Sequence, residues 1–208
     1  MFDFSSLAAF VGVVLGLFLI PGPAVLLTVT RAAQSGRKAG VMTGVGIASG
    51  DLIHTLGTAL GLSALLMTSA LAFNVVKYAG AGYLVYLGVR AFLERPTDPS
   101  LPRVSSVSAG RAYLQAMGTE VLNPKTALFF LAFLPQFVHP ERGSSLVQFL
   151  VLGLIFVVLS ILYTTALALS VKPLLQYVRR LSWLARWQGK IVGTIFVGLG
   201  VRVALQRR

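Results

Sequence analysis

Four ionisable side chains lie inside long apolar stretches of this sequence: Asp51, His54, Glu120 and Lys125. An ionisable group in hydrocarbon costs roughly 2.5 to 3.5 kcal/mol on insertion scales, so its presence there predicts a function or a specific partner. Asp51 and His54 are three residues apart and would share one face of a helix. Because desolvation disfavours a charged carboxylate, Asp51 is a candidate for exchanging a proton near neutral pH, or for remaining ionised beside a cation.

Each of these residues also has an alternative role in the fold. Asp51 could be a structural partner of Lys125 or of backbone amides. His54 could share protons with Asp51, since imidazole titrates near neutral pH, or it could serve only packing. Lys125 could bind a substrate carboxylate, neutralise Asp51 or extend toward the membrane surface. Glu120 lies one turn before a proline, where it could face a cytoplasmic vestibule.

Two prolyl stretches interrupt the apolar segments, Pro21-Gly22-Pro23 and Asn123-Pro124-Lys125. Proline within a helix removes an amide donor and clashes with the preceding turn, so in lipid the freed backbone groups need protein or water partners. The helix start behind such a break favours anionic groups through its free amides and dipole, although a simple kink without a ligand is the alternative. We therefore expect two sets of site residues. The substrate-binding set is Pro21, Gly22, Pro23, Asp51, Asn123, Pro124 and Lys125, and the proton-coupling set is Asp51, His54 and Glu120.

The composition predicts an all-α integral membrane protein. Of the 208 residues 56% are hydrophobic and 12% are charged, and the mean hydropathy is +0.81. A soluble domain of this size is less apolar and more charged. Helices of about 20 apolar residues cross a bilayer, and six such runs are present, at about 7–30, 40–69, 71–93, 112–138, 146–170 and 189–206. We expect one six-span domain over residues 1–208.

The net charge of +12 indicates topology more than nucleic-acid binding. Most basic residues fall after the first, third and fifth runs: Arg31, Arg37, Lys38; Arg90, Arg95, Arg103, Arg111; Lys172, Arg179, Arg180, Arg186 and Lys190. By the positive-inside rule these three loops are cytoplasmic and both termini are periplasmic. The chain has no cysteine, which excludes disulfides and thiolate metal sites. With no nucleophile or metal cluster apparent, we expect neither an enzyme nor a cofactor.

An internal repeat is suggested by two sets of matching residues. Leu19-Ile-Pro21-Gly-Pro-Ala24 aligns with Leu122-Asn-Pro124-Lys-Thr-Ala127, and the pattern Lys77-x-x-Gly80 followed by Leu87-Gly-Val-Arg90 recurs from Lys190 to Arg202. Repeat one would cover 1–93, a Pro- and Ser-rich linker 94–110, and repeat two 111–208. Since each repeat holds three spans, an odd number, the second would be inverted, as in many secondary transporters. Chance similarity of glycine-rich helices is the alternative.

These residues resemble the lysine exporter superfamily, in its homoserine/threonine (RhtB-type) branch. The similar stretches are Ile20-Pro-Gly-Pro23, Gly40 to Asp51, Gly61-Leu-Ser-Ala-Leu65 and, most specific of all, Leu122 to Phe137. The resemblance implies a multi-pass exporter of amino acids in the bacterial inner membrane, driven by the proton-motive force. It places the substrate-binding set at motif positions of the family, whereas His54 and Glu120 rest on the argument from the residues.

The sequence thus predicts a transporter that exports threonine- or homoserine-like zwitterionic amino acids by proton antiport, with protons and the lipid bilayer as its other partners. A passive channel or facilitator for small polar metabolites is the alternative, and a homodimer is left open. The few intramembrane charges and the paired breaks favour a carrier over a continuous polar pore.

The topology is testable with reporter fusions. Alkaline phosphatase is active only outside the cytoplasm, so a fusion after Arg208 should be active and a fusion near Ser105 inactive, as the loop charges require. Enzyme activity normalised to fusion abundance is the measurement. The reverse pattern would contradict both the orientation and the inverted repeat.

Overall fold

The computed structural model describes residues 2–19, 22–68, 70–93 and 105–171, together with 190, 193–194, 197–198, 200–201 and 205. Its elements are α1 (Phe4–Leu19), α2 (Pro23–Gln34), α3 (Arg37–Thr68), α4 (Ala70–Leu93), α5 (Ala109–Val121), α6 (Pro124–Ala132), the 3-10 turns η1 (Leu134–Phe137) and η2 (Pro140–Arg142), and α7 (Ser145–Leu169). The described residues among 190–205 are all helical, and no strand occurs in the described part of the chain.

The helices lie where the apolar runs predict them. By length and composition α7 is long and apolar enough to cross a membrane by itself, and α1 with α2 meets the same test as a pair bent by 59°. The other helices of the described residues do not pass that test. The structure is therefore consistent with an all-helical membrane protein, while the count of six spans stays a prediction.

The predicted break at Asn123-Pro124 is confirmed. α5 ends at Val121, Asn123 caps the next helix with its side chain, and α6 begins at Pro124, the position where a missing amide costs least. At the first break α1 ends at Leu19 and α2 begins at Pro23. Ile20 and Pro21 lie outside the described residues.

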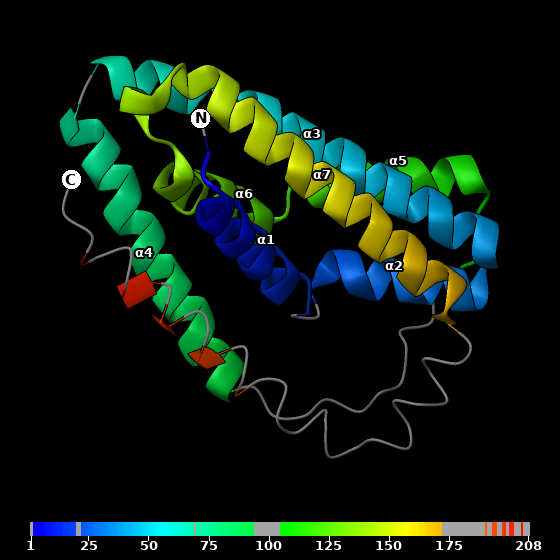
Figure 1. Ribbon diagram of the computed structural model, residues 1–208. Helices are drawn as coiled ribbons and strands as arrows, with labels where there is room; N and C mark the ends of the chain where they lie inside the picture. Colours follow the sequence, from blue (N-terminus) through cyan, green and yellow to red (C-terminus); the bar gives the residue numbers. More distant parts are fainter. Residues whose placement is uncertain are drawn as a thin grey trace.

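The long helices α3 and α7 form the spine of the fold (Figure 1), with α2 and α5 beside them at one end. The half-helices α1 and α6 occupy the middle, and α4 packs against α6. Aromatic residues fill the space between these elements: Phe10, Phe129, Phe130, Phe149 and Phe156 are fully buried. Burial of such large rings supplies most of the packing energy.

Glycines on α3 set how closely its neighbours approach. A β-carbon at Gly46 would lie 3.0 Å from Ala116 Cβ, and one at Gly50 would lie 2.7 Å from Glu120 Cβ, so both residues let α5 pack against the α3 backbone. Gly57 and Gly61 repeat the four-residue spacing of small residues that often allows close helix packing. Among the described residues, however, no atom of another element lies within 4 Å of a β-carbon built at either glycine.

α3 and α7 meet through two reciprocal glycine–threonine contacts. A β-carbon at Gly44 would lie 3.0 Å from Thr164 Cβ, and one at Gly153 would lie 2.8 Å from Thr55 Cβ. Because the residue numbers increase along one helix as they decrease along the other, the two helices are antiparallel. Each threonine hydroxyl donates to its own helix, Thr55 to Asp51 O at 2.8 Å and Thr164 to Ser160 O at 2.7 Å.

An exposed ion pair connects the start of α1 to the turn before α7. Arg142 Nη1 lies 2.8 Å from Asp3 Oδ2, and Asp3 also accepts the Ser6 amide at 2.7 Å. The Arg142 guanidinium, followed by the Ser6 amide, holds the pKa of Asp3 well below its usual range. The contribution of this pair to stability is therefore present above the ordinary pKa of an aspartate and is lost only in strong acid.

The packing roles of the α3 glycines can be separated by a matched pair of variants. Gly57→Ala should be neutral or stabilise by up to about 1 kcal/mol, because alanine favours a helix and the site is open. Gly46→Ala should destabilise by roughly 1 to 3 kcal/mol, since its methyl group would overlap α5. Denaturation of both variants in detergent is the measurement. Equal shifts would contradict the assigned packing.

Candidate functional site

The second helix break encloses a buried carboxylate. Glu120 is 2% exposed, and its oxygens accept hydrogen bonds from Thr126 Oγ1 at 2.5 Å and from Asn123 Nδ2 at 3.2 and 3.3 Å. Asn123 Oδ1 in turn accepts the Lys125 amide at 3.1 Å, which caps α6. Asn123 therefore connects the Glu120 carboxyl group to the start of α6.

Glu120 thus places a carboxyl group at the N-terminal end of α6, the end of a helix that favours anionic groups. The sequence predicts a ligand carboxylate at this helix start, whereas in the structure the chain supplies a carboxyl group of its own. Gly50 makes room for it, because a side chain there would overlap Cβ and Cγ of Glu120. Among the described residues no side chain caps the start of α2 at Gly22, so the two helix starts differ.

Lys125 extends from the second break to the first. Its Nζ donates to Leu17 O, in the last turn of α1, at 3.4 Å. A β-carbon on Gly22 would lie 3.0 Å from the same Nζ. The break segments of the two halves therefore meet at this ammonium group, whose positive charge suits the carbonyl end of α1. Pro23 is exposed at the first turn of α2, and Pro124 occupies the same position in α6.

Asp51 is a buried carboxyl group on α3 beside this cluster. It is 1% exposed, and neither of its carboxyl oxygens makes a hydrogen bond to a described residue. Ser160 and Glu120 nevertheless lie close enough to form side-chain hydrogen bonds with it after a small movement, and the charges of Glu120 and Lys125 also act on it. A buried carboxylate without hydrogen bonds is strongly disfavoured, so this position suits a group that takes up a proton or a cation.

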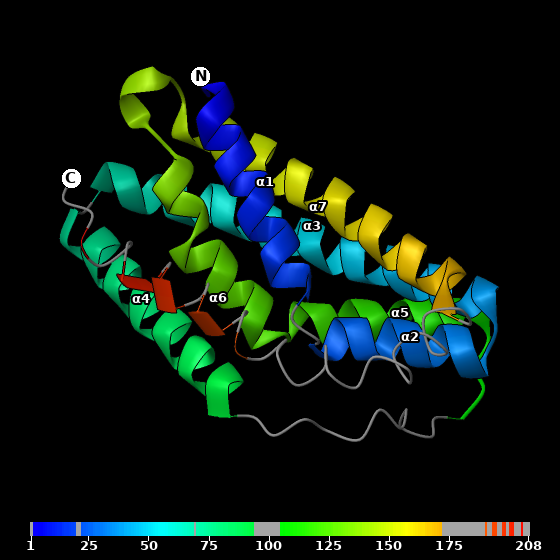
Figure 2. The ribbon, with the colours of Figure 1, turned by 60° about the horizontal axis from the view of Figure 1, so that its bottom comes forward.

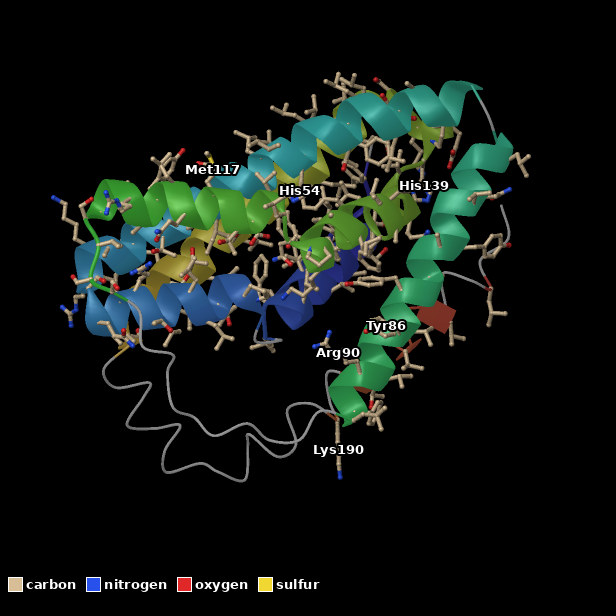
Figure 3. The ribbon with its side chains drawn as sticks, turned by 180° about the vertical axis from the view of Figure 1, so that it is seen from behind. His54, Tyr86, Arg90, Met117, His139 and Lys190 are labelled. Carbon is tan, nitrogen blue, oxygen red and sulfur yellow. The ribbon has the colours of Figure 1, made fainter. Side chains whose placement is uncertain are left out.

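His54 lies at the edge of the cluster, where α5 gives way to α6 (Figure 3). Its Nε2 is 3.0 Å from the backbone oxygen of Glu120. Since a carbonyl only accepts, Nε2 carries the proton in this contact. The ring also packs against Phe130, with centroids 5.8 Å apart. The structure therefore places His54 next to the second break and not in contact with the Asp51 carboxyl.

Two polar residues of this region were not singled out from the sequence. Thr126 follows Lys125 in the break motif, and its role depends on the position of Glu120 six residues earlier. Ser160 comes from α7, and the one available signal was its spacing: it follows Asp51 by 109 residues, as Gly153 follows Gly44 and Thr164 follows Thr55. Among the residues that the structure describes, no three His, Cys, Asp or Glu side chains gather as a metal site would need.

An all-helical, strongly apolar chain that encloses two carboxyl groups and an ammonium at paired helix breaks has the character of a membrane transport protein. The chain belongs to the LysE type translocator family, whose sequence profile matches residues 15–207. Membership makes it a membrane translocator and not an enzyme, and it confirms the superfamily expected from the sequence motifs.

The chain is similar over most of its length to several membrane proteins. It is 35% identical over 191 residues to the uncharacterized membrane protein PA4757 of Pseudomonas aeruginosa, covering 89% of this chain and 88% of that protein. It is 29% identical over 209 residues to the membrane protein YrhP of Bacillus subtilis, covering 96% and 99%. It is also 29% identical over 187 residues to the leucine efflux protein of Salmonella typhimurium, covering 89% and 88%. No solved structure matches the chain significantly.

Proposed function

We propose that this translocator exports small zwitterionic amino acids across the bacterial inner membrane by proton antiport. The observation that carries the proposal is the buried cluster of Asp51, Glu120 and Lys125 at the point where the two helix breaks meet. A zwitterion offers an ammonium and a carboxylate, the two charges that such a site complements. Family membership and the leucine efflux relatives support amino acids as the substrate class.

Asp51 supplies the coupling. Its carboxyl oxygens are buried and meet no described donor within hydrogen-bond geometry, with Ser160 and Glu120 close by. We therefore assign to it either a proton or the ammonium of a ligand. The two cannot bind together, and this exclusion is what proton antiport requires. Glu120 differs from Asp51, because Thr126 and Asn123 already donate to it. We therefore assign the exchangeable proton to Asp51 and the fixed negative charge to Glu120, with His54 as a positioning partner.

The ligand carboxylate is assigned to the start of α2. Glu120 already occupies the corresponding end of α6, whereas no side chain of the part that the structure describes caps α2 at Gly22. The Lys125 ammonium lies beside Gly22 and adds the positive charge that a carboxylate needs. Pro23 and Pro124 begin the two helices, and Asn123 holds the α6 start in place. The substrate-binding role of Pro21, which lies outside the described residues, stays a prediction.

The inverted repeat belongs to this proposal as its structural basis. In the proposed repeat, Gly153 of α7 corresponds to Gly44 of α3, and Thr164 corresponds to Thr55. Gly44 packs against Thr164 and Gly153 packs against Thr55, as a two-fold axis between α3 and α7 would require. Residues of the last apolar run make a matching pair of contacts with α4, in which Gly88 lies against Gly193 O and Gly200 lies against Ala81 O. Gly200 corresponds to Gly88 in the proposed repeat, and Gly193 corresponds to Ala81. Under the same relation Ser160 is the counterpart of Asp51 and Leu17 that of Glu120, so one half alone carries the charges.

The amino acid itself can be identified by ligand-induced stabilisation, since a true substrate raises the melting temperature by mass action. L-threonine and L-homoserine come from the sequence motifs, and L-leucine from the relatives, so a screen starts with these three. A passive channel is the alternative function. Accumulation in liposomes against a gradient, driven only by an imposed pH difference, separates the carrier from the channel.

The coupling role predicts the behaviour of Asp51→Asn. The amide keeps the shape of the side chain but cannot exchange a proton, so pH-driven transport should fall to the level of empty liposomes. Exchange of substrate for substrate, which needs no proton, should be retained at least in part. The measurement compares the two modes in one preparation. Full pH-driven transport with an unchanged pH profile would mean that Asp51 is structural.

The carboxylate role predicts the behaviour of Lys125→Met. Methionine retains an apolar stem but removes the charge, so binding of a free amino acid should weaken by about tenfold or more, whereas binding of its amide should change little. Thermal shift with each ligand is the measurement. Equal losses for both ligands would show that Lys125 serves the helix breaks alone.

A further inference from the structure

Arg31, near the end of α2, is a buried charged residue that the proposed site does not use. It is 6% exposed. Nη1 donates to Ser105 O at 2.6 Å and Nη2 to Gln115 Oε1 at 2.7 Å, while Nε is buried without a partner. Both acceptors are uncharged, and the described residues contain no ion pair to Arg31. The guanidinium is therefore bonded but not neutralised.

The two acceptors lie at the surface, Ser105 in the segment before α5 and Gln115 on α5. Ser105 and Gln115 are exposed, whereas Arg31 is buried behind them. α2 and α5 lie side by side (Figure 2), and the charge distribution predicts that this end faces the cytoplasm. At 1.5 Å per residue, Arg31 is about 12 Å along α2 from the helix start where Lys125 and Gly22 meet. One helix thus connects Arg31 with the proposed carboxylate site.

A guanidinium binds a carboxylate through charge-assisted, often bidentate hydrogen bonds, which are roughly twice as strong as bonds to neutral acceptors. A carboxylate that reaches Arg31 would therefore displace Gln115 and the Ser105 carbonyl. We propose that Arg31 is the entry site for the substrate carboxylate, and that its bonds to Ser105 and Gln115 form a gate which the carboxylate opens. This inference rests on the proposed function for the identity of the ligand, but not for the existence of the gate.

If the contact between Arg31 and Gln115 served only stability, an acidic residue at position 115 would stabilise the protein further, because a permanent ion pair would neutralise the buried guanidinium. The neutral Gln115 leaves the contact breakable. Gln115→Glu therefore distinguishes the two roles: it should hold the gate shut and slow transport while the melting temperature is maintained or raised. If the contact were only structural, the same change would raise the melting temperature without slowing transport.

The gate can be measured without transport, because the natural chain has no cysteine. Thr30 is buried next to Arg31, so a Thr30→Cys probe reports opening by its rate of reaction with a membrane-impermeant maleimide in inverted vesicles. Arg31→Gln should raise that rate about tenfold, and Gln115→Glu should lower it. Arg37→Gln, which removes an exposed arginine at the start of α3, is the matched control and should leave the rate unchanged.

The carboxylate is tested with L-leucine and L-leucinamide as probes. Leucine should raise the labelling rate of the Thr30→Cys protein, while leucinamide and the Gln115→Glu background should show no rise. Equal rates in the Arg31→Gln, Gln115→Glu and Arg37→Gln proteins would overturn the gate, and equal effects of leucine and leucinamide would overturn the carboxylate assignment. Uptake of amino acids by the wild-type protein, measured in parallel, tests the proposed function separately, since the variant comparison decides the gate without any substrate.

Discussion

The hydrogen bonds that close the second helix break are the constraint on which the rest of the site depends. A break in an apolar environment leaves amides and carbonyls that must be satisfied within the protein. Here Asn123 caps the new helix and also donates to Glu120, so one amide side chain satisfies both the backbone and a buried charge. Once that carboxylate is fixed, a cation is needed nearby, and Lys125 provides it while also reaching the end of α1.

This cluster determines how the long helices pack. α5 can bring Glu120 into the interior only because α3 has a glycine where a side chain would overlap it. The same helix presents Asp51 one residue later, so the position that admits one carboxyl group also places the second beside it. Two acids close together in a dry environment make the second charge expensive, which is the condition for exchanging a proton with a cationic ligand.

Under the proposed inverted repeat, the two halves share a plan of packing but not of charge. Reciprocal glycine–threonine contacts join α3 to α7, yet the proposed counterpart of Asp51 is a serine and that of Glu120 is a leucine. Symmetric packing needs only small residues at corresponding crossings, whereas each buried charge needs a set of partners and costs several kcal/mol without them. A single charged site is therefore the cheaper arrangement, and the gate formed by Arg31 would serve that site from one end of α2.

The sequence by itself determined the helices, their approximate limits and the break at Asn123, because apolar runs and proline act locally. It also singled out Asp51, Glu120 and Lys125, since charge in an apolar run is visible without a fold. Only the tertiary structure decided which partners these groups have. That Lys125 reaches Leu17, that Arg31 meets Gln115, and that Gly46 but not Gly57 receives a neighbouring helix all depend on which helix faces are brought together. Residue spacing along one helix defines its faces but not what packs against them, and distant segments meet only when the whole chain has folded.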